Sequence, residues 1–294
     1  MKNNKKKKMI SFGFMLPVAI IVFSLVIYPI VQMFILSFQN VRFLGATAHN
    51  IHFTLENYYK LVHSPSFWST LNITGIYVLA TTLIAFVIGL ATALLLNQKF
   101  KGNHIARIAF LLAWPIPGVV VSWIFIWMFD PSFGVINYIL RSLRIISTNL
   151  AWLSSPNTAL AATISATVWK AYPFFTLMLY AGLQGIPEEL YEAASVDGAT
   201  AIDKFKCITL PGLRSVITIS VLLSALWVFR TFDIIFLMTG GGPFGSTEIL
   251  PVKLYQEAFS YFHMSYAATM GVITFVICAI VIAASTPILK KEFY

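Results

Sequence analysis

Apolar residues in this chain are gathered into long runs, without the alternation of a half-buried strand or the single apolar stripe of a soluble helix. The hydrocarbon core of a bilayer is about 30 Å thick, and a helix crosses it with roughly 20 apolar residues. Runs of sufficient length lie at about residues 10–38, 70–96, 105–129, 159–183, 215–238 and 265–289. The pattern therefore predicts an all-α integral membrane protein with six transmembrane helices.

The first of these runs has two features of a secretory signal peptide, because lysines precede it and a small-residue motif follows it at 46–48. The apolar region of a signal peptide spans only about 7–15 residues, however, and the run over 10–38 is about twice as long. We therefore expect a retained first span. The predicted organisation is a basic cytoplasmic tail over residues 1–9 and a single transmembrane domain over residues 10–294.

Composition narrows the possible functions. Of 294 residues, 58% are apolar and 11% are charged, whereas a soluble domain carries about 25% charged residues. So few charges do not cover the surface of a soluble enzyme. The net charge of +9 does not indicate nucleic-acid binding, because most basic residues lie in the N-terminal tail or at the ends of apolar runs. The two cysteines and five histidines have no spacing suited to a disulfide framework or a metal site, so we expect no metal.

Basic residues also predict the orientation in the membrane. Six spans place both termini on one side, and with the termini in the cytoplasm the inner segments carry 13 lysines and arginines against five in the outer segments. Cytoplasmic segments of membrane proteins are enriched in these residues. We therefore expect cytoplasmic N- and C-termini, which places the loop over residues 184–214 inside the cell as well.

This inner loop is charged and carries the signals of a short helix. Pro187 suits a first helical position, where its missing N–H costs nothing. Glu188 and Glu189 follow in the first turn, where the helix dipole favours negative charge. Gly198 is placed to end the helix, since glycine adopts the left-handed conformation without penalty.

A second short helix is predicted directly after the glycine. Thr200 and Asp203 have the spacing of a capping box, with Asp in place of the usual Glu or Gln. The first helix places Glu192 beside two alanines, so another protein's backbone can approach closely and an arginine can pair with the carboxylate. A helix lying on lipid favours basic residues, whereas residues 187–198 carry four acids and no base. We therefore interpret the loop as a protein-docking element.

The spacing within the loop resembles a known family. Glu192-Ala-Ala is followed after three residues by Gly198, and after nine more by Ile208-Thr-Leu-Pro211. This pattern is similar to the EAA loop of binding-protein-dependent ABC importer permeases, between spans four and five. The resemblance implies a cytoplasmic coupling helix that sits in a cleft of a separate ATPase, with the glutamate paired to an ATPase arginine. The implied docking residues are Glu188, Glu192, Ala193, Ala194, Asp197, Gly198, Ile208, Leu210 and Pro211.

Two further stretches resemble the carbohydrate-uptake branch of that family. Residues 232–243, which end in Thr-Gly-Gly-Gly-Pro, and residues 186–199 are similar to the first-listed permease of maltose- and glycerol-phosphate-type transporters. The resemblance implies a bacterial cytoplasmic membrane subunit, surrounded by lipid, that imports a sugar or oligosaccharide by alternating access. Its implied partners are a second permease in a heterodimer, an ABC ATPase dimer and an extracytoplasmic solute-binding protein. ATP and Mg are then bound by the ATPase, and no cofactor or catalytic residue is expected on this chain.

Charged residues inside the predicted spans are candidates for the transport pathway, since charge is costly there and usually faces a cavity or a partner. We expect Lys170 to line a cavity or to act in gating. Arg230 and Asp233 are three residues apart, so on one helix they share a face and can form an ion pair. A structural pair and a pathway role are equally open. The candidate pathway residues are Lys170, Tyr172, Trp227, Phe229, Arg230 and Asp233.

Two other functions remain open at this point. An importer of the same build could carry glycerol phosphate or another polar solute. A polytopic membrane enzyme could use the polar groups within the spans.

Overall fold

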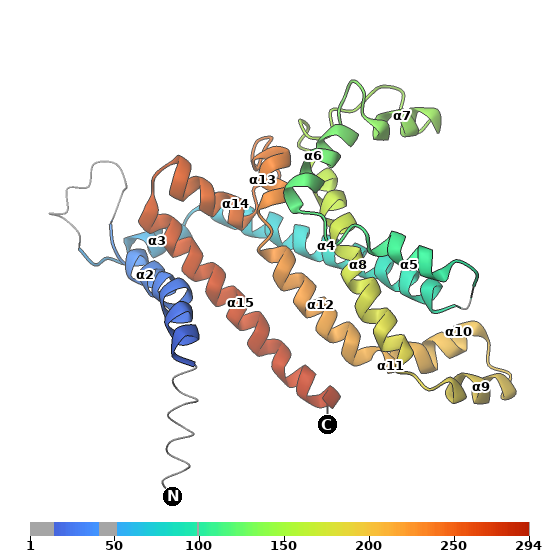
Figure 1. Ribbon diagram of the computed structural model, residues 1–294. Helices are drawn as coiled ribbons and strands as arrows, with labels where there is room; N and C mark the ends of the chain where they lie inside the picture. Colours follow the sequence, from blue (N-terminus) through green and yellow to red (C-terminus); the bar gives the residue numbers. More distant parts are fainter. Residues whose placement is uncertain (1–14, 41–51, 99, 294) are drawn as a thin grey trace, which may run out of the picture. The chain divides into compact units, whose positions relative to one another are not determined.

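The computed structural model describes residues 15–40, 52–98 and 100–293 (Figure 1). In this part of the chain the regular structure is helical, apart from an isolated bridge between Gln39 and Phe53, so the all-α prediction is confirmed. The helices follow in the order η1 (Phe23–Ile27), α2 (Tyr28–Ser37), α3 (Glu56–Val62), α4 (Pro65–Asn97), α5 (Asn103–Leu111), α6 (Gly118–Met128), α7 (Val135–Ser142), α8 (Ala159–Gln184), α9 (Glu188–Val196), α10 (Ala201–Lys204), η3 (Phe205–Thr209), α11 (Leu210–Gly212), α12 (Arg214–Phe229), α13 (Asp233–Thr239), α14 (Leu250–Tyr255), η4 (Gln256–Ser260) and α15 (Met264–Phe293), where η denotes a π-helical turn.

The chain forms two compact units. The first contains the residues up to Phe67 together with Leu254–Ile277. Within it, the fully buried Ser37 at the end of α2 joins two other helices. Its hydroxyl lies 2.8 Å from the Tyr58 hydroxyl of α3, and its carbonyl oxygen accepts a hydrogen bond of 3.2 Å from Thr269 of α15. Phe34 and Phe275 add an edge-to-face ring contact at 5.8 Å.

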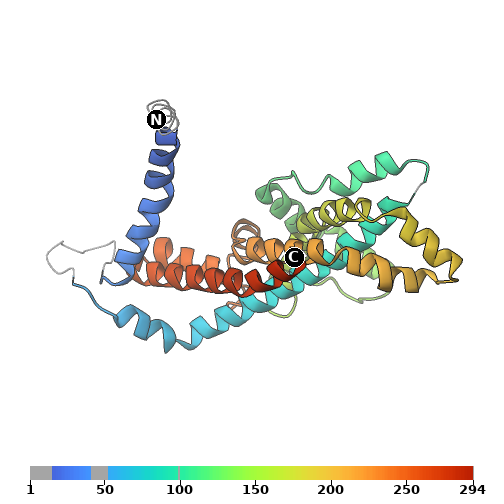
Figure 2. The same cartoon turned by 90° about the horizontal axis from the view of Figure 1, so that it is seen from below.

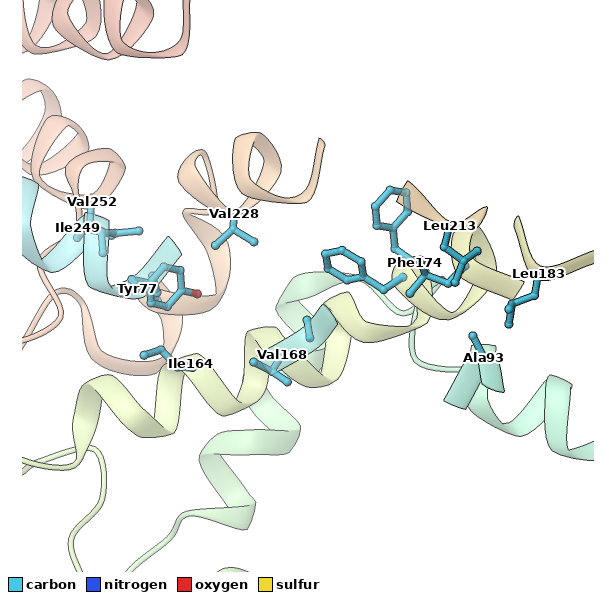
Figure 3. Close-up of a cluster of buried hydrophobic side chains, with 14 residues drawn as sticks. Tyr77, Ala93, Ile164, Val168, Phe174, Leu183, Leu213, Val228, Ile249 and Val252 are labelled. Atoms are coloured by element: carbon cyan, nitrogen blue, oxygen red, sulfur yellow. The ribbon is translucent and has the colours of Figure 1, made fainter. Parts of the chain in front are cut away.

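The second unit contains Trp68–Lys253 and the segment from Cys278 onward. Its main apolar cluster follows α8 from Ile164, beside Tyr77 of α4, to Leu183, beside Ala93 (Figure 3). Hydroxyl groups join the same two helices: Tyr77 lies 2.5 Å from Thr167, and Thr92 lies 2.6 Å from Thr176. A smaller apolar cluster, the α6–α13 cluster, gathers Val121, Phe125, Phe129, Ala162, Ala166, Ile234 and Met238.

Long apolar helices occupy several of the predicted spans. Among the described residues, Met15–Ser37, Pro65–Asn97 and Met264–Thr286 are long and apolar enough to cross a membrane. They correspond to the first, second and sixth predicted runs. The fourth run is the continuous 26-residue helix α8. The other two runs are broken, which the apolar pattern did not predict.

The run over 105–129 is divided into α5 and α6. Helix α5 ends at Leu111 and α6 begins at Gly118, with Pro115 and Pro117 between them. Proline lacks the N–H of a helical hydrogen bond and disfavours a helical conformation in the residue before it. The expectation of one continuous helix here is therefore wrong.

The run over 215–238 is also divided. Helix α12 ends at Phe229 and α13 begins at Asp233, and the residue before α13, Phe232, has φ −124° and ψ −53°. Because the helix stops between Arg230 and Asp233, these residues do not share a helix face. The described residues show no ion pair between them. The prediction that they share a helix face is therefore wrong.

Candidate functional sites

Helix α9 begins one residue later than the loop sequence predicts. Pro187, the predicted first helical residue, is instead the extended capping residue, with φ −57° and ψ 132°, and the helix starts at Glu188. Glu188 and Glu189 lie in the first turn. Their carboxylates therefore face the positive end of the helix dipole, as predicted.

Gly198 ends α9 in the left-handed conformation, with φ +76°. Two hydrogen bonds close the helix end: the Ala199 N–H donates to the Ala194 carbonyl at 2.9 Å, and the Gly198 N–H donates to the Ser195 carbonyl at 3.2 Å. This pair of bonds is the Schellman arrangement, which needs a residue at positive φ. The predicted role of Gly198 in ending the helix is confirmed.

A capping box starts α10, also as predicted. The Asp203 N–H donates to the Thr200 hydroxyl oxygen at 3.3 Å, and the Thr200 N–H donates to the Asp203 carboxylate at 2.9 Å. The Thr200 hydroxyl also donates to this carboxylate at 2.5 Å, and these bonds hold the pKa of Asp203 below its ordinary value of 3.8. Pro211 lies within the continuing helical segment, which bends by 65° into α12 after Gly212.

Side chains hold α9 against the segment that follows it. The Tyr191 hydroxyl lies 3.0 Å from that of Thr209, which is buried in η3. The Lys204 ammonium donates to the Ser195 hydroxyl at 2.6 Å. Figures 1 and 2 show α9 and α10 together at one end of the second unit, beyond the ends of α8 and α12. The two short helices are therefore a fixed pair.

Most predicted docking residues lie on the surface of this helix pair. Glu188, Glu192, Ala193, Asp197, Gly198 and Pro211 are exposed, and Ala194, Ile208 and Leu210 are half-buried. The sequence reasoning missed two apolar side chains on the same surface: Val196 is 88% exposed and Ile202 is 64% exposed. Val196 follows Glu192 by one helical turn, so the two share a face. Apolar positions within a charged loop were the signal that could have identified them.

A second candidate site surrounds Lys170, in the middle of α8. A cavity of about 170 Å³ is lined by this lysine, by Trp114 from the α5–α6 break, by Trp227 of α12, by Thr231 from the α12–α13 break and by Asp233 of α13. The Lys170 ammonium donates to the carbonyl of Trp114 at 3.4 Å and to the carbonyl of Ile116. Lys170 therefore lines a cavity, and its expected part in the transport pathway stays a prediction.

Asp233, the first residue of α13, lies beside the end of the α5–α6 break, where α6 begins. A Cβ atom on Gly118, the first residue of α6, would overlap the Asp233 carboxylate, so glycine permits this close approach. Asp233 also lies in the first turn of α13, and its charge interacts electrostatically with Lys170. A lysine and an aspartate from different helices therefore flank the α5–α6 break.

The structure brings together only part of the predicted pathway set. Lys170, Trp227 and Asp233 line the cavity, whereas Tyr172, Phe229 and Arg230 do not. The Trp227 ring packs edge-to-face on Phe174 at 4.8 Å. Sequence reasoning missed Trp114 and Thr231, although Trp114 begins a Trp-Pro-Ile-Pro sequence that could have indicated the break.

Comparison with known proteins identifies the family. Residues 85–292 match the family described as the binding-protein-dependent transport system inner membrane component. The chain belongs to this family. The matched segment contains the whole α9–α10 pair and every residue of the Lys170 cavity. The two candidate sites are therefore parts of an inner membrane transport component.

Relatives match almost the whole length of this membrane component. It is 35% identical over 277 residues to the sulfoquinovosyl glycerol transport system permease protein of Agrobacterium fabrum, covering 94% of this chain and 89% of that protein. It is 33% identical over 287 residues to the trehalose/maltose transport system permease protein of Thermococcus litoralis, covering 94% of both. The chain is thus a transport permease and a multi-pass membrane protein.

A solved structure shares the fold of the permease. A chain of a bacterial ABC transporter that imports the acidic polysaccharide alginate superposes with a TM-score of 0.84, covering 98% of both chains at 20% identity. At this identity the likeness supports the fold alone. It agrees with the helical permease architecture described above.

Proposed function

We propose that this permease is a membrane subunit of an ATP-driven importer that carries a sugar or oligosaccharide across the bacterial cytoplasmic membrane. The observation that carries the proposal is the match to permeases of sulfoquinovosyl glycerol and trehalose/maltose transport over 94% of the chain. A third relative, the diacetylchitobiose uptake system permease protein of Streptomyces coelicolor, is 32% identical over 90% of the chain. All three names refer to glycosidic solutes.

The proposed topology has six spans, two of them broken. The spans are Met15–Ser37, α4, α5 with α6, α8, α12 with α13, and α15. The N- and C-termini lie in the cytoplasm, as does the α9–α10 pair. The supporting observation is the excess of basic residues in the inner segments, 13 against five.

The α9–α10 pair is proposed to dock a separate ABC ATPase dimer. Glu192 offers an exposed carboxylate to an arginine of the ATPase, while Val196 and Ile202 lose their exposed apolar surface to the partner. Such a mixture of an apolar centre and charged surroundings is typical of protein interfaces. The bonds from Tyr191 and Lys204 keep the pair rigid, so movement of the ATPase is transmitted to α8 and α12.

The other proposed components follow from the same family. A second permease completes the membrane pathway, and an extracytoplasmic solute-binding protein delivers the solute. ATP and Mg bind to the ATPase, and this chain carries neither a cofactor nor a catalytic residue. Alternating access then depends on helix movements that the ATPase drives through α9 and α10.

Direct uptake measurements test the proposed solute class. The complex is produced in cells that lack other importers for the test solutes, and uptake of labelled mono-, di- and trisaccharides, glycerol phosphate and amino acids is measured one solute at a time. Uptake of one or more saccharides alone supports the proposal. Uptake of glycerol phosphate alone, or of amino acids alone, contradicts the sugar assignment.

A further inference from the structure

Three helices are weakened where they border one cavity. The α5–α6 break contributes Trp114, the α12–α13 break contributes Thr231, and α8 contributes Lys170. Pro173 lies within α8 one turn after Lys170, and proline cannot donate the helical hydrogen bond to the residue four positions earlier. Breaks and prolines are the places where helices bend most easily. The cavity therefore marks a position at which three spans can change shape.

The segments on either side of the α5–α6 break are packed differently. Helix α6 packs with α13 through Val121, Phe125, Ile234 and Met238 of the α6–α13 cluster. Helix α5, in contrast, has no fully buried residue and contacts α8, where the Arg107 guanidinium donates to the Tyr180 hydroxyl at 2.5 Å. Because α6 shares its apolar cluster with α13 and α5 does not, the α6–α13 pair can turn relative to α5 at the break between α5 and α6.

The Lys170 side chain donates hydrogen bonds to backbone carbonyl groups within the α5–α6 break. Carbonyl groups in a break between two helices lack the N–H partner that a continuous helix would supply, and a buried one needs another donor. The ammonium of Lys170 donates to two of the carbonyls between α5 and α6, those of Trp114 and Ile116. Two of its three N–H bonds are therefore directed at the protein backbone, which leaves Lys170 poorly placed to recognise a solute.

Asp233 lies where the α5–α6 break ends and α6 begins. Its carboxylate lies against Gly118 at the amino end of α6 and is itself in the first turn of α13, so both helix dipoles favour its negative charge. Its charge also attracts the ammonium of Lys170. Lys170 and Asp233 thus connect α8 and α13 with the α5–α6 break and the start of α6.

We propose that Lys170 and Asp233 are positioning residues that fix the shape of the α5–α6 break and make it move together with α8 and α13 during transport. The proposal rests on the proposed transport function and deepens it, because it assigns the pair to the movement and not to solute recognition. Neither side chain contacts the solute. Loss of either charge leaves the break loose, so that ATPase movement at α9 and α10 no longer reaches α6.

The test compares Lys170→Met, Lys170→Arg and Asp233→Asn in the intact complex in lipid nanodiscs and proteoliposomes. Ser165→Ala is the matched control on α8, because among the described residues the Ser165 hydroxyl bonds within its own helix, to the Ala162 carbonyl at 2.7 Å. Backbone hydrogen exchange is measured in peptides covering residues 112–121, with a peptide from α4 as the internal reference. Uptake is measured as a function of solute concentration, and retained ATPase is quantified.

Lys170→Met and Asp233→Asn are expected to speed exchange over 112–121 and leave the α4 peptide unchanged. Maximal uptake should fall by about tenfold or more, since a hydrogen bond to a charged group typically contributes at least a tenfold change in an equilibrium. The KM for solute and the amount of retained ATPase should stay the same, and Lys170→Arg should restore much of the rate. Unchanged exchange in both variants, or a raised KM with an unchanged maximal rate, overturns the proposal. If the native permease itself retains no ATPase, the proposed docking function is contradicted. That outcome is distinct from a failure of the proposal on Lys170 and Asp233, which shows in hydrogen exchange and uptake kinetics while ATPase remains bound.

Discussion

Substitution of Gly198 tests the docking helices through the backbone alone. An added Cβ at this position meets no atom of the described residues within 4 Å, so it causes no collision with them. The cost comes from φ +76°, a conformation that disfavours residues other than glycine by about 1–2 kcal/mol and β-branched residues by more. Asparagine tolerates this region best among the other residues.

The size of the effect follows from these energies. If a variant relaxes out of the left-handed end in the free permease and must return to it to bind the ATPase, then each 1.4 kcal/mol of strain weakens binding about tenfold. We therefore expect the dissociation constant of the ATPase to rise in the order Gly198→Asn, Gly198→Ala and Gly198→Val. The alanine variant should bind about 5- to 30-fold more weakly than the native permease, and the valine variant still more weakly.

The assay is titration of purified ATPase onto nanodisc-embedded permease, followed by solute uptake in proteoliposomes. Gly185→Ala is the matched control, because Gly185 also follows a helix but has φ −85° and room for a Cβ at ordinary contact distance, 3.4 Å. The control should bind ATPase normally. Equal, native-like affinity of the valine and asparagine variants would show that the left-handed end of α9 does not matter for docking.

Three further predictions concern the same inner segment. In the same titration, Glu192→Lys should weaken ATPase binding by about 1.5–3 kcal/mol, the usual contribution of a hydrogen bond to a charged group. Glu189→Lys is the control, and equal losses in the two variants would contradict a specific role of Glu192. The exposed Cys207 should react in intact cells with a membrane-permeant thiol reagent and not with an impermeant one, so labelling by the impermeant reagent would reverse the topology. Thr200 stabilises the Asp203 carboxylate and lowers its pKa below 3.8, so this stabilisation is present above that pH and is lost as the pH falls further. The thermal midpoint of the complex should accordingly drop less between pH 5 and pH 3 in Asp203→Asn than in the native chain; identical drops would contradict the assignment.

Local signals were sufficient to predict the docking helices. The proline before α9, the left-handed glycine after it and the capping box of α10 each depend on residues within five positions of one another. Such contacts form whatever the rest of the chain does, so the sequence carries them directly. Two boundaries differed. Helix α9 begins one residue later than predicted, and the fifth predicted run is preceded by a helical segment that continues to Gly212 and bends there into α12.

The breaks and the charged cavity depended on information that hydropathy does not contain. The run over 105–129 was predicted from its average hydropathy, which does not register the helix-breaking effect of Pro115 and Pro117. The contact between Lys170 and the Ile116 carbonyl joins residues 54 positions apart, and no periodic pattern predicts it. Arg230 and Asp233 were placed on one face only because a continuous helix was assumed between them.

ATP-driven uptake into proteoliposomes tests the central claim most directly. The permease is reconstituted with its partner permease and ATPase, with ATP enclosed in the lumen and labelled sugar added outside with the solute-binding protein. For complexes whose α9–α10 pair faces the lumen, sugar should accumulate against its gradient and stop accumulating when ATP or the solute-binding protein is omitted. Sugar entry that is unaffected by removing ATP, or no accumulation of any tested saccharide by a complex that hydrolyses ATP and carries another solute, would contradict the account.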